Sequence, residues 1–239
     1  MTEVKLSGVD QKVVVAWSSN GELMNMSFAE IGIIGDVHAE ADYLEIALHF
    51  FQMAQVEKIL CVGDIVDGRG NVDRCCNLLD QAEVVTVRGN HDRWLVEGVM
   101  RDSSEATQWS DISETSHAFM RSLPNTKVIE TITGRLLLCH GLGENDMQRL
   151  TPDDYGYALE VIGELHSLIA NQEYKFVVNG HTHRRMVRRF ENLTIINAGT
   201  LYAKHEPCIA IANFRTGFVQ FYDFQEKGLV RSGDLVRLQ

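Results

Sequence analysis

Short apolar runs alternate with amphipathic stretches in the first part of the chain. Residues 31–34, 58–62 and 83–87 are apolar runs with the length of buried strands. Between them, residues 42–55 and 71–79 place apolar side chains along one helical face, the second after an asparagine that suits a helix N-cap. A strand–helix–strand–helix–strand order at this spacing predicts βαβ units and a parallel sheet.

The pattern is more varied further along the chain. A helix is expected at 91–98, and the polar, irregular stretch 99–123, which ends in a helix from residue 113, is interpreted as an excursion that would cover a site. The remaining expected elements are a hairpin of strands 127–132 and 135–139, a helix that starts at Thr151-Pro152 and runs to residue 169, a strand at 176–178, and short strands over 186–230 that form an antiparallel closing sheet.

The N-terminal segment 1–30 is ambiguous, with a strand pattern at 12–17, and we interpret it as an extension. We find neither repeats nor a linker-like stretch in the sequence. The prediction is therefore a single domain over residues 1–239, with two sheets and outer helices.

Composition narrows the class of protein. The 239 residues are 45% apolar and 23% charged, which is ordinary for a globular protein, and the formal net charge of −11 argues against a partner that is polymeric nucleic acid. The five cysteines form no CxxC pair, and no apolar stretch approaches the roughly 20 residues of a membrane span. These features predict a cytoplasmic protein with no membrane contact.

Five short loops rich in Asp, His and Asn each follow an apolar run. They are Gly35-Asp36-Val37-His38, the loop 63–68, Gly89-Asn90-His91-Asp92, Cys139-His140-Gly141 and Gly180-His181-Thr182-His183. Polar residues at successive strand ends converge on one edge of an open α/β sheet. Oxygen and imidazole donors together suit divalent transition metals, so the sequence predicts a metal site at that edge.

Taken in order, these loops resemble the motifs of the calcineurin-like metallophosphoesterases: Asp-x-His, Gly-Asp, Gly-Asn-His, a lone His and Gly-His-x-His. The resemblance covers roughly residues 31–200. It implies an α/β fold of the two-sheet α/β/β/α sandwich type. It also implies a metal-dependent phosphoesterase in which metal-activated hydroxide attacks phosphorus.

The resemblance further implies two divalent transition metal ions, with Mn, Fe, Zn and Co as candidates. The first ion would be held by Asp36, His38, Asp64 and His183, and the second by Asp64, Asn90, His140 and His181. Asp64 would bridge them, because a carboxylate has two oxygens.

Two further residues take catalytic roles by the same resemblance. His91 would protonate the leaving oxygen, and Asp67, which matches the second acid of the protein-phosphatase Gly-Asp-x-x-Asp motif, would orient it. The chain departs from that motif at Gly68, where the protein phosphatases carry the arginine that binds phosphate. Arg69 is the nearest candidate for substrate binding.

The expected substrates are phosphate mono- or diesters of small molecules such as nucleotides. A protein serine/threonine phosphatase and a dinucleoside-polyphosphate hydrolase are the alternatives within the enzyme class. A metal-free interaction module on the same fold, like the retromer subunit, is the alternative from another class, and it predicts missing ligands.

Overall fold

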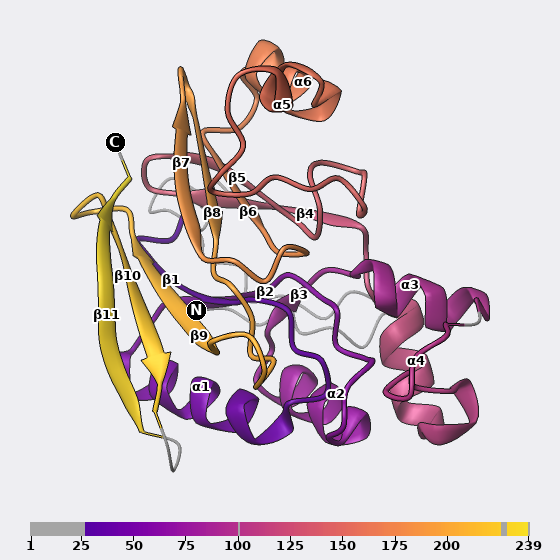
Figure 1. Ribbon diagram of the computed structural model, residues 1–239. Coiled ribbons are helices and arrows are strands. Elements are labelled where there is room, and N and C mark those ends of the chain that lie inside the picture. Colours follow the sequence, from indigo (N-terminus) through magenta and orange to yellow (C-terminus); the bar gives the residue numbers. More distant parts are fainter. Residues whose placement is uncertain (1–26, 100, 226–228, 239) are drawn as a thin grey trace, which may run out of the picture.

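Two β-sheets pack face to face in the computed structural model of the chain (Figure 1), which describes residues 27–99, 101–225 and 229–238. The strands are β1 (Glu30–Ile34), β2 (Lys58–Cys61), β3 (Val85–Thr86), β4 (Thr126–Thr131), β5 (Gly134–Cys139), β6 (Phe176–Asn179), β7 (Met186–Phe190), β8 (Leu193–Asn197), β9 (Cys208–Asn213), β10 (Phe218–Phe224) and β11 (Val230–Arg237). The first sheet has the order β11-β10-β9-β1-β2-β3, and the second has the order β4-β5-β6-β8-β7.

Helices flank the two sheets. They are α1 (Ala41–Ala54), α2 (Val72–Gln81), α3 (Asn90–Glu97), α4 (Glu114–Ser122), α5 (Tyr157–Glu160) and α6 (Gly163–Asn171), with a short 3-10 turn, η1 (Trp109–Asp111). In Figure 1, α1 and α2 lie below the first sheet, and α5 and α6 lie at the opposite end of the molecule. This is the α/β/β/α sandwich that the sequence predicts.

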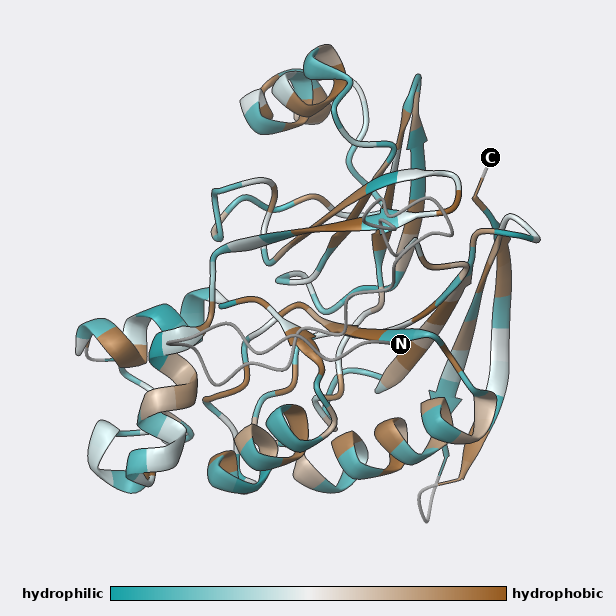
Figure 2. Ribbon diagram, turned by 180° about the vertical axis from the view of Figure 1, so that it is seen from behind, coloured by the Kyte–Doolittle hydropathy of each residue, from teal (hydrophilic) through white to brown (hydrophobic). Residues whose placement is uncertain are grey.

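Three apolar layers hold the sandwich together. The middle layer joins the two sheets, with Ile33 and Leu60 from the first sheet packed among Leu136, Phe176 and Val178 from the second. A second layer lies between the first sheet and α1 and α2, and a third lies between the second sheet and α6. In Figure 2, apolar and polar residues alternate along α1 and α2, and the inner strands are mostly apolar.

The predicted parallel core is confirmed. Strands β1, β2 and β3 run parallel, and so do β5, β6 and β8. The carboxyl ends of these strands therefore meet at one edge of each sheet. The predicted N-cap of α2 is confirmed as well, because the Asn71 side chain accepts a hydrogen bond from the Arg74 N–H at 2.8 Å.

The predicted helix over 151–169 is wrong in its first half. Asp154 Oδ2 accepts from the Thr151 N–H at 2.6 Å, so this stretch closes into a tight turn instead of starting a helix. Gly156 has a φ of 53°, outside the helical region. The chain forms only the short helix α5 before α6 begins at Gly163.

The predicted closing sheet over 186–230 is also wrong, since its strands are divided between the two sheets. The hairpin β7–β8 extends the second sheet, where β8 runs parallel to β6. Strands β9 to β11 extend the first sheet, where β9 pairs antiparallel with β1. The pattern of apolar residues identifies these strands but does not show which of the two sheets each one joins.

Two other expectations concern the third strand and the N-terminal segment. The third strand is two residues long, Val85–Thr86, where residues 83–87 were expected. The strand expected at 12–17 and most of the N-terminal extension lie outside the described residues. No helix in the described part of the chain has the length and apolar character needed to cross a membrane.

Candidate metal centre

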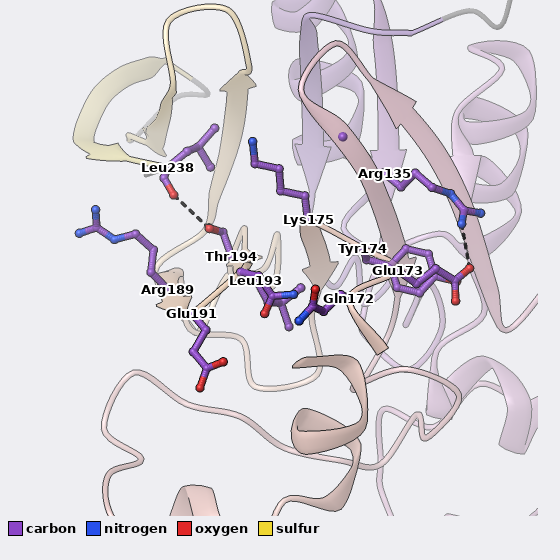
Figure 3. A pocket seen from close by; sticks show the side chains of 12 residues that line it. Arg135, Gln172, Glu173, Tyr174, Lys175, Arg189, Glu191, Leu193, Thr194 and Leu238 are labelled. Carbon is purple, nitrogen blue, oxygen red and sulfur yellow. Dashed lines mark hydrogen bonds and ion pairs between the residues drawn. The ribbon is translucent and has the colours of Figure 1, made fainter. Parts of the chain in front are cut away.

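The two ends of the parallel strands differ in chemistry. A hollow at their amino ends is lined by residues at the starts of β5, β6 and β8, including Arg135, Lys175 and Thr194 (Figure 3). None of the predicted ligands lines this hollow. The predicted ligands lie after the carboxyl ends instead, and Asp64 and His140 follow β2 and β5 within a few residues.

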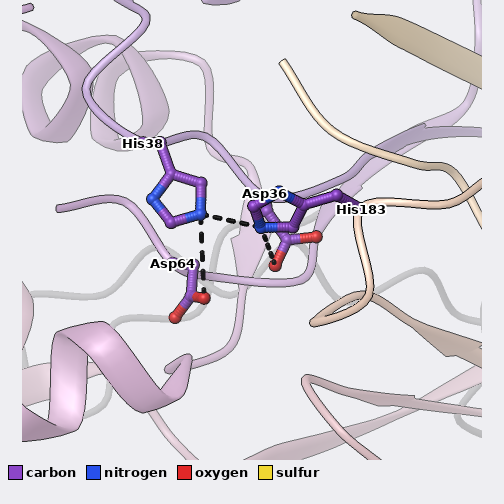
Figure 4. A group of neighbouring side chains, drawn as sticks. All are labelled: Asp36, His38, Asp64 and His183. Carbon is purple, nitrogen blue, oxygen red and sulfur yellow. Dashed lines mark hydrogen bonds and ion pairs between the residues drawn. The ribbon is translucent and has the colours of Figure 1, made fainter. Parts of the chain in front are cut away.

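The first predicted ligand set comes together as a cluster. The ligand atoms of Asp36, His38, Asp64 and His183 all lie within 4.8 Å of one another. Figure 4 shows the His38 and His183 rings and the two carboxylates gathered around one point. The Nε2 atoms of the two histidines are 2.9 Å apart, and His38 Nε2 is 3.9 Å from Asp64 Oδ2.

The second predicted set lies on the other side of Asp64. The ligand atoms of Asp64, His140 and His181 also lie within 4.8 Å of one another. Asn90 joins them, since its Oδ1 is 2.9 Å from His140 Nε2 and 2.9 Å from His181 Nδ1. Asp64 thus belongs to both groups, which is the position that a bridging carboxylate requires.

Backbone carbonyls orient two of the ligand histidines. His140 Nδ1 donates to the Val62 carbonyl at 2.8 Å, and His38 Nδ1 donates to the Asp67 carbonyl at 2.9 Å. In the neutral imidazole these hydrogen bonds place the proton on Nδ1 and leave the Nε2 lone pair facing the cluster. His183 Nδ1 lies 2.8 Å from Nδ1 of His205, a residue that belongs to none of the five loops.

The charges inside the cluster are strongly coupled. Burial raises the pKa of Asp36 to about 6. Burial opposes a charge on His140, but the carboxylates of Asp64 and Asp36 outweigh it and raise the pKa of His140 to about 10. Burial and the neighbouring histidines lower the pKa of His181 to about 4 and that of His183 to about 3. Two buried carboxylates beside His181 and His183, which favour the neutral form, provide donors for a cation.

The donor set fits divalent metals. Asp36 Oδ2 is fully buried, yet it has no hydrogen-bond partner among the described residues. A buried carboxylate oxygen of this kind is costly unless a cation or a donor satisfies it. The mixture of imidazole nitrogens with carboxylate and amide oxygens suits Mn, Fe, Zn or Co.

The backbone of the cluster is unusual. His38, Asp64, Asp67, His181 and His183 all have positive φ, between 47° and 66°. Side chains other than glycine adopt this left-handed region rarely and at a cost in free energy. The loops therefore turn sharply at the residues that carry the side chains of the site.

His91 and Asp67 form the predicted pair beside the cluster. His91 Nδ1 donates to Asp67 Oδ2 at 2.6 Å, and His91 Nε2 is 4.0 Å from Asp64 Oδ2. Burial opposes a charge on the imidazole, but the hydrogen bond with Asp67 and the charge of Asp64 raise the pKa of His91 above its usual value. This ring can carry a proton at the edge of the cluster.

Asp92 holds the loop that carries Asp64 and Asp67. Its Oδ1 accepts from the Ile65 N–H at 2.8 Å, and its Oδ2 accepts from the Gly89 N–H at 2.9 Å. Asp92 therefore fastens the loop of Asp64 to the start of α3, as an acid in the first turn of a helix can. None of its hydrogen bonds involves the His91 ring.

A family comparison agrees with this geometry. Residues 29–217 match the calcineurin-like phosphoesterase superfamily domain. The chain belongs to the calcineurin-like phosphoesterase superfamily. Its members depend on divalent metals, and the two ligand groups provide candidate sites for them.

Solved structures share the fold at low sequence identity. A hypothetical protein of Pyrococcus horikoshii has a TM-score of 0.68 at 15% identity, over 83% of this chain and 89% of that one. A metallophosphoesterase of Sphaerobacter thermophilus has a TM-score of 0.63 at 22% identity, over the same shares of the two chains.

One curated relative matches more locally. An uncharacterized protein of Methanocaldococcus jannaschii is 34% identical over 62 residues, which is 26% of each chain. The match therefore spans about a quarter of that relative's length.

Gly68 shows why this superfamily member departs from the protein-phosphatase motif. A Cβ atom at Gly68 would lie 1.9 Å from the His38 carbonyl oxygen, so no arginine fits there. Arg69 has a side chain that is 79% exposed, and its Nε pairs with Glu105 Oε1 at 2.7 Å. A substrate-binding role for Arg69 stays a prediction, and the structure directs its charge to Glu105.

Arg101 is the residue that sequence reasoning missed. It comes from the excursion 99–123, which was expected to cover a site, and its side chain forms an ion pair with Asp67. Residue 101 belongs to no motif and follows no strand, so local sequence carries no signal for this contact.

Proposed function

We propose that this chain is a dinuclear-metal-dependent phosphoesterase that hydrolyses phosphate mono- or diesters of small molecules such as nucleotides. The observation that carries the proposal is the position of Asp64 in two ligand groups at once, with His91 beside them. Two divalent ions, when bound there, supply Lewis acidity for the phosphoryl oxygens and generate the nucleophile from water near neutral pH. Manganese, iron, zinc and cobalt are the candidates that the donors suit.

The chain's own residues account for the proton that the leaving group needs. His91 Nδ1 is occupied by Asp67 Oδ2, so Nε2 is the atom that faces the reacting groups. The protonated His91 gives its Nε2 proton to the leaving oxygen, and the negative charge of Asp67 stabilises the imidazolium before transfer. The backbone N–H of His91 donates to Asp64 Oδ1 at 2.9 Å, which holds His91 at a set position relative to the ligands.

Several features support a small substrate over the alternatives. The Gly68 position excludes the arginine of the protein-phosphatase motif, which counts against that alternative. The net charge of −11 disfavours polymeric nucleic acid. All seven ligand positions carry donor side chains, whereas a metal-free interaction module has no need of them. The five cysteines are buried and unpaired, which supports the expectation of a reducing, cytoplasmic setting.

The test is a metal-reconstitution assay. The purified protein is stripped with a chelator, reloaded separately with Mn, Zn, Fe(II) or Co, and assayed on a panel of phosphate mono- and diesters. The matched variants are Asp64→Asn, which removes the shared ligand, and Asp42→Asn, an exposed acid on α1. We expect metal-dependent hydrolysis by the wild type and Asp42→Asn but not by Asp64→Asn. If the reloaded wild type is faster than Asp64→Asn on none of the esters, the proposal is refuted.

A further inference from the structure

The carboxylate of Asp67 contacts Arg101 as well as His91, and both residues approach its Oδ2 atom. Arg101 Nη2 donates to Asp67 Oδ1 at 2.8 Å, and Arg101 Nε lies 2.7 Å from Asp67 Oδ2. Both oxygens of the carboxylate therefore meet one planar guanidinium group. The first contact is a hydrogen bond, and the second is a close contact between opposite charges without hydrogen-bond alignment. Together they restrict the rotation of the carboxylate as well as its position.

Thr107 completes the frame around Asp67. Its N–H donates to Asp67 Oδ1 at 2.8 Å, and its hydroxyl oxygen accepts from the Asp67 N–H at 3.1 Å. The Thr107 carbonyl accepts from Arg101 Nη2 at 2.7 Å. Asp67 is thus restrained at its backbone and at both carboxylate oxygens, and all of these contacts come from the part of the excursion 99–123 that precedes α4.

A second anchor ties this excursion to the neighbouring loops. Glu105 accepts from Arg69 Nε, from Lys204 Nζ at 2.7 Å and from the Tyr202 hydroxyl at 2.6 Å. The Tyr202 ring lies 5.3 Å from the ring of His38, a predicted ligand. The segment that carries Arg101 and Thr107 is therefore fastened to two other loops through Glu105, as well as to Asp67.

The contacts of Arg101 leave little room for a substrate phosphate. Its Nη1 donates to the Val99 carbonyl at 2.9 Å, Nη2 donates to Asp67 and Thr107, and Nε is buried beside Asp67 Oδ2. The side chain is 12% exposed, compared with 79% for Arg69. An arginine that binds a phosphate needs donors that face the substrate.

We propose that Arg101 is a positioning residue that acts through Asp67: it fixes the carboxylate so that His91 keeps its Nε2 directed at the leaving oxygen. This inference rests on the proposed phosphoesterase function and deepens it. It assigns part of the proton-transfer machinery to the excursion, which contains no predicted ligand. Among the described residues Arg101 forms no hydrogen bond or ion pair with a predicted ligand, so we expect metal content to change little when it is replaced.

Kinetics on two kinds of ester test this role. Arg101→Gln is compared with Arg101→Lys and with Arg121→Ala, a control in the same excursion whose guanidinium lies 4.8 Å above the Trp109 ring. We expect Arg101→Gln to lower kcat on an alkyl phosphate ester by about 10-fold or more, a part of the full effect of acid catalysis. The loss on a nitrophenyl ester should be smaller, KM and metal content should change little, and Arg101→Lys should recover part of the rate.

Two results would contradict the proposal. A raised KM with equal losses on both esters would make Arg101 a substrate-binding residue instead. Additive effects of Arg101→Gln and Asp67→Asn in the double variant would show that the two residues act separately, whereas action through Asp67 predicts that the second change adds little.

A spectroscopic measurement separates this inference from the proposed function. The His91 Nδ1 proton, identified in 15N-labelled protein by its absence in His91→Asn, should give a downfield NMR signal because of the 2.6 Å hydrogen bond to Asp67. We expect this signal to broaden or disappear in Arg101→Gln and to persist in Arg121→Ala. An unchanged signal in Arg101→Gln overturns the positioning role, and this holds even if the wild type hydrolyses no ester.

Discussion

The backbone N–H of His91 donates to Oδ1 of Asp64 at 2.9 Å, so the proposed acid and the carboxylate shared by both ligand groups are joined directly. The other carboxylate oxygen, Oδ2, lies 3.2 Å from His140 Nε2 and 3.9 Å from His38 Nε2. Asp64 thus sets the spacing between the ligands and the first turn of α3. Changes at this residue should affect both.

Asp64→Asn should lower metal content at both positions, because an amide offers one neutral oxygen where the carboxylate offers two charged ones. We expect activity to fall by more than about 100-fold, beyond the usual effect of outer-shell partners. His183→Asn, which changes only the first group, should lose about one ion of two. Metal analysis of both variants checks this, and two tightly bound ions with near-normal activity in Asp64→Asn would exclude the bridging role.

His91→Asn should be selective for the leaving group. An alkoxide leaves poorly without a proton, so the variant should lose about 10²–10⁴-fold in kcat on an alkyl phosphate ester. A nitrophenolate leaves without help, and the loss on that ester should be clearly smaller. Metal content is measured alongside, because His91 is no proposed ligand. Equal losses on both esters would favour a phosphate-binding or structural role.

Gly89→Ala should disturb the ligands through a steric clash. A Cβ atom at Gly89 would lie 2.1 Å from Asp64 Oδ1 and 2.4 Å from the Asp64 backbone nitrogen. We expect a loss of stability of about 1–3 kcal/mol, as for other overpacked sites, together with weaker metal binding. Gly163→Ala in α6 is the control, because nothing lies within 4 Å of its Cβ position. Thermal denaturation and metal titration of both variants provide the comparison.

The metal-free protein should lose stability as the pH rises above 6.5. The raised pKa of His140, about 10, means that the folded protein holds a proton that the unfolded chain releases between pH 6.5 and 10. This contribution is complete below pH 6.5 and is lost as the pH approaches 10, with a slope of up to about 1.4 kcal/mol per pH unit. Bound metal should reduce the slope, because it displaces the proton.

Denaturation of the chelated protein at pH 7, 8 and 9 measures this slope. His140→Asn should reduce the slope to the smaller part that the raised pKa of His91 contributes. His166→Asn, a change at an exposed histidine on α6, should retain the full slope. Stability of the chelated wild type that stays constant or increases over this range would contradict the assigned charge on His140.

The fold class and the gathering of the ligand residues could be predicted because both depend on local sequence. Apolar runs identify β1, β2 and β6 as buried strands, and Asp36, Asp64 and His181 come soon after them. Parallel pairing then carries these residues to one edge, whatever the details of the helices. Their grouping needs only the strand order and direction.

The missed features depend on contacts between distant parts of the chain. Arg101 reaches Asp67 across 34 positions, and His205 reaches His183 across 22, and neither partner shares a motif or a periodic pattern with the other. The assignment of β9 to the first sheet depends on pairing with β1, which is remote in sequence. The false helix start at Thr151 has a local cause, since the same Thr and Asp residues that cap a helix can also close a turn.

The left-handed backbone at the site has a consequence for evolution and for protein engineering. Each of His38, Asp64, Asp67, His181 and His183 holds a conformation that costs on the order of 1–3 kcal/mol for a side chain other than glycine. Glycine at any one of them should relax the loop, so a screen for thermostability alone would tend to select changes that abolish activity. At these positions, selection for stability would therefore favour glycine, whereas selection for activity would favour the present side chains.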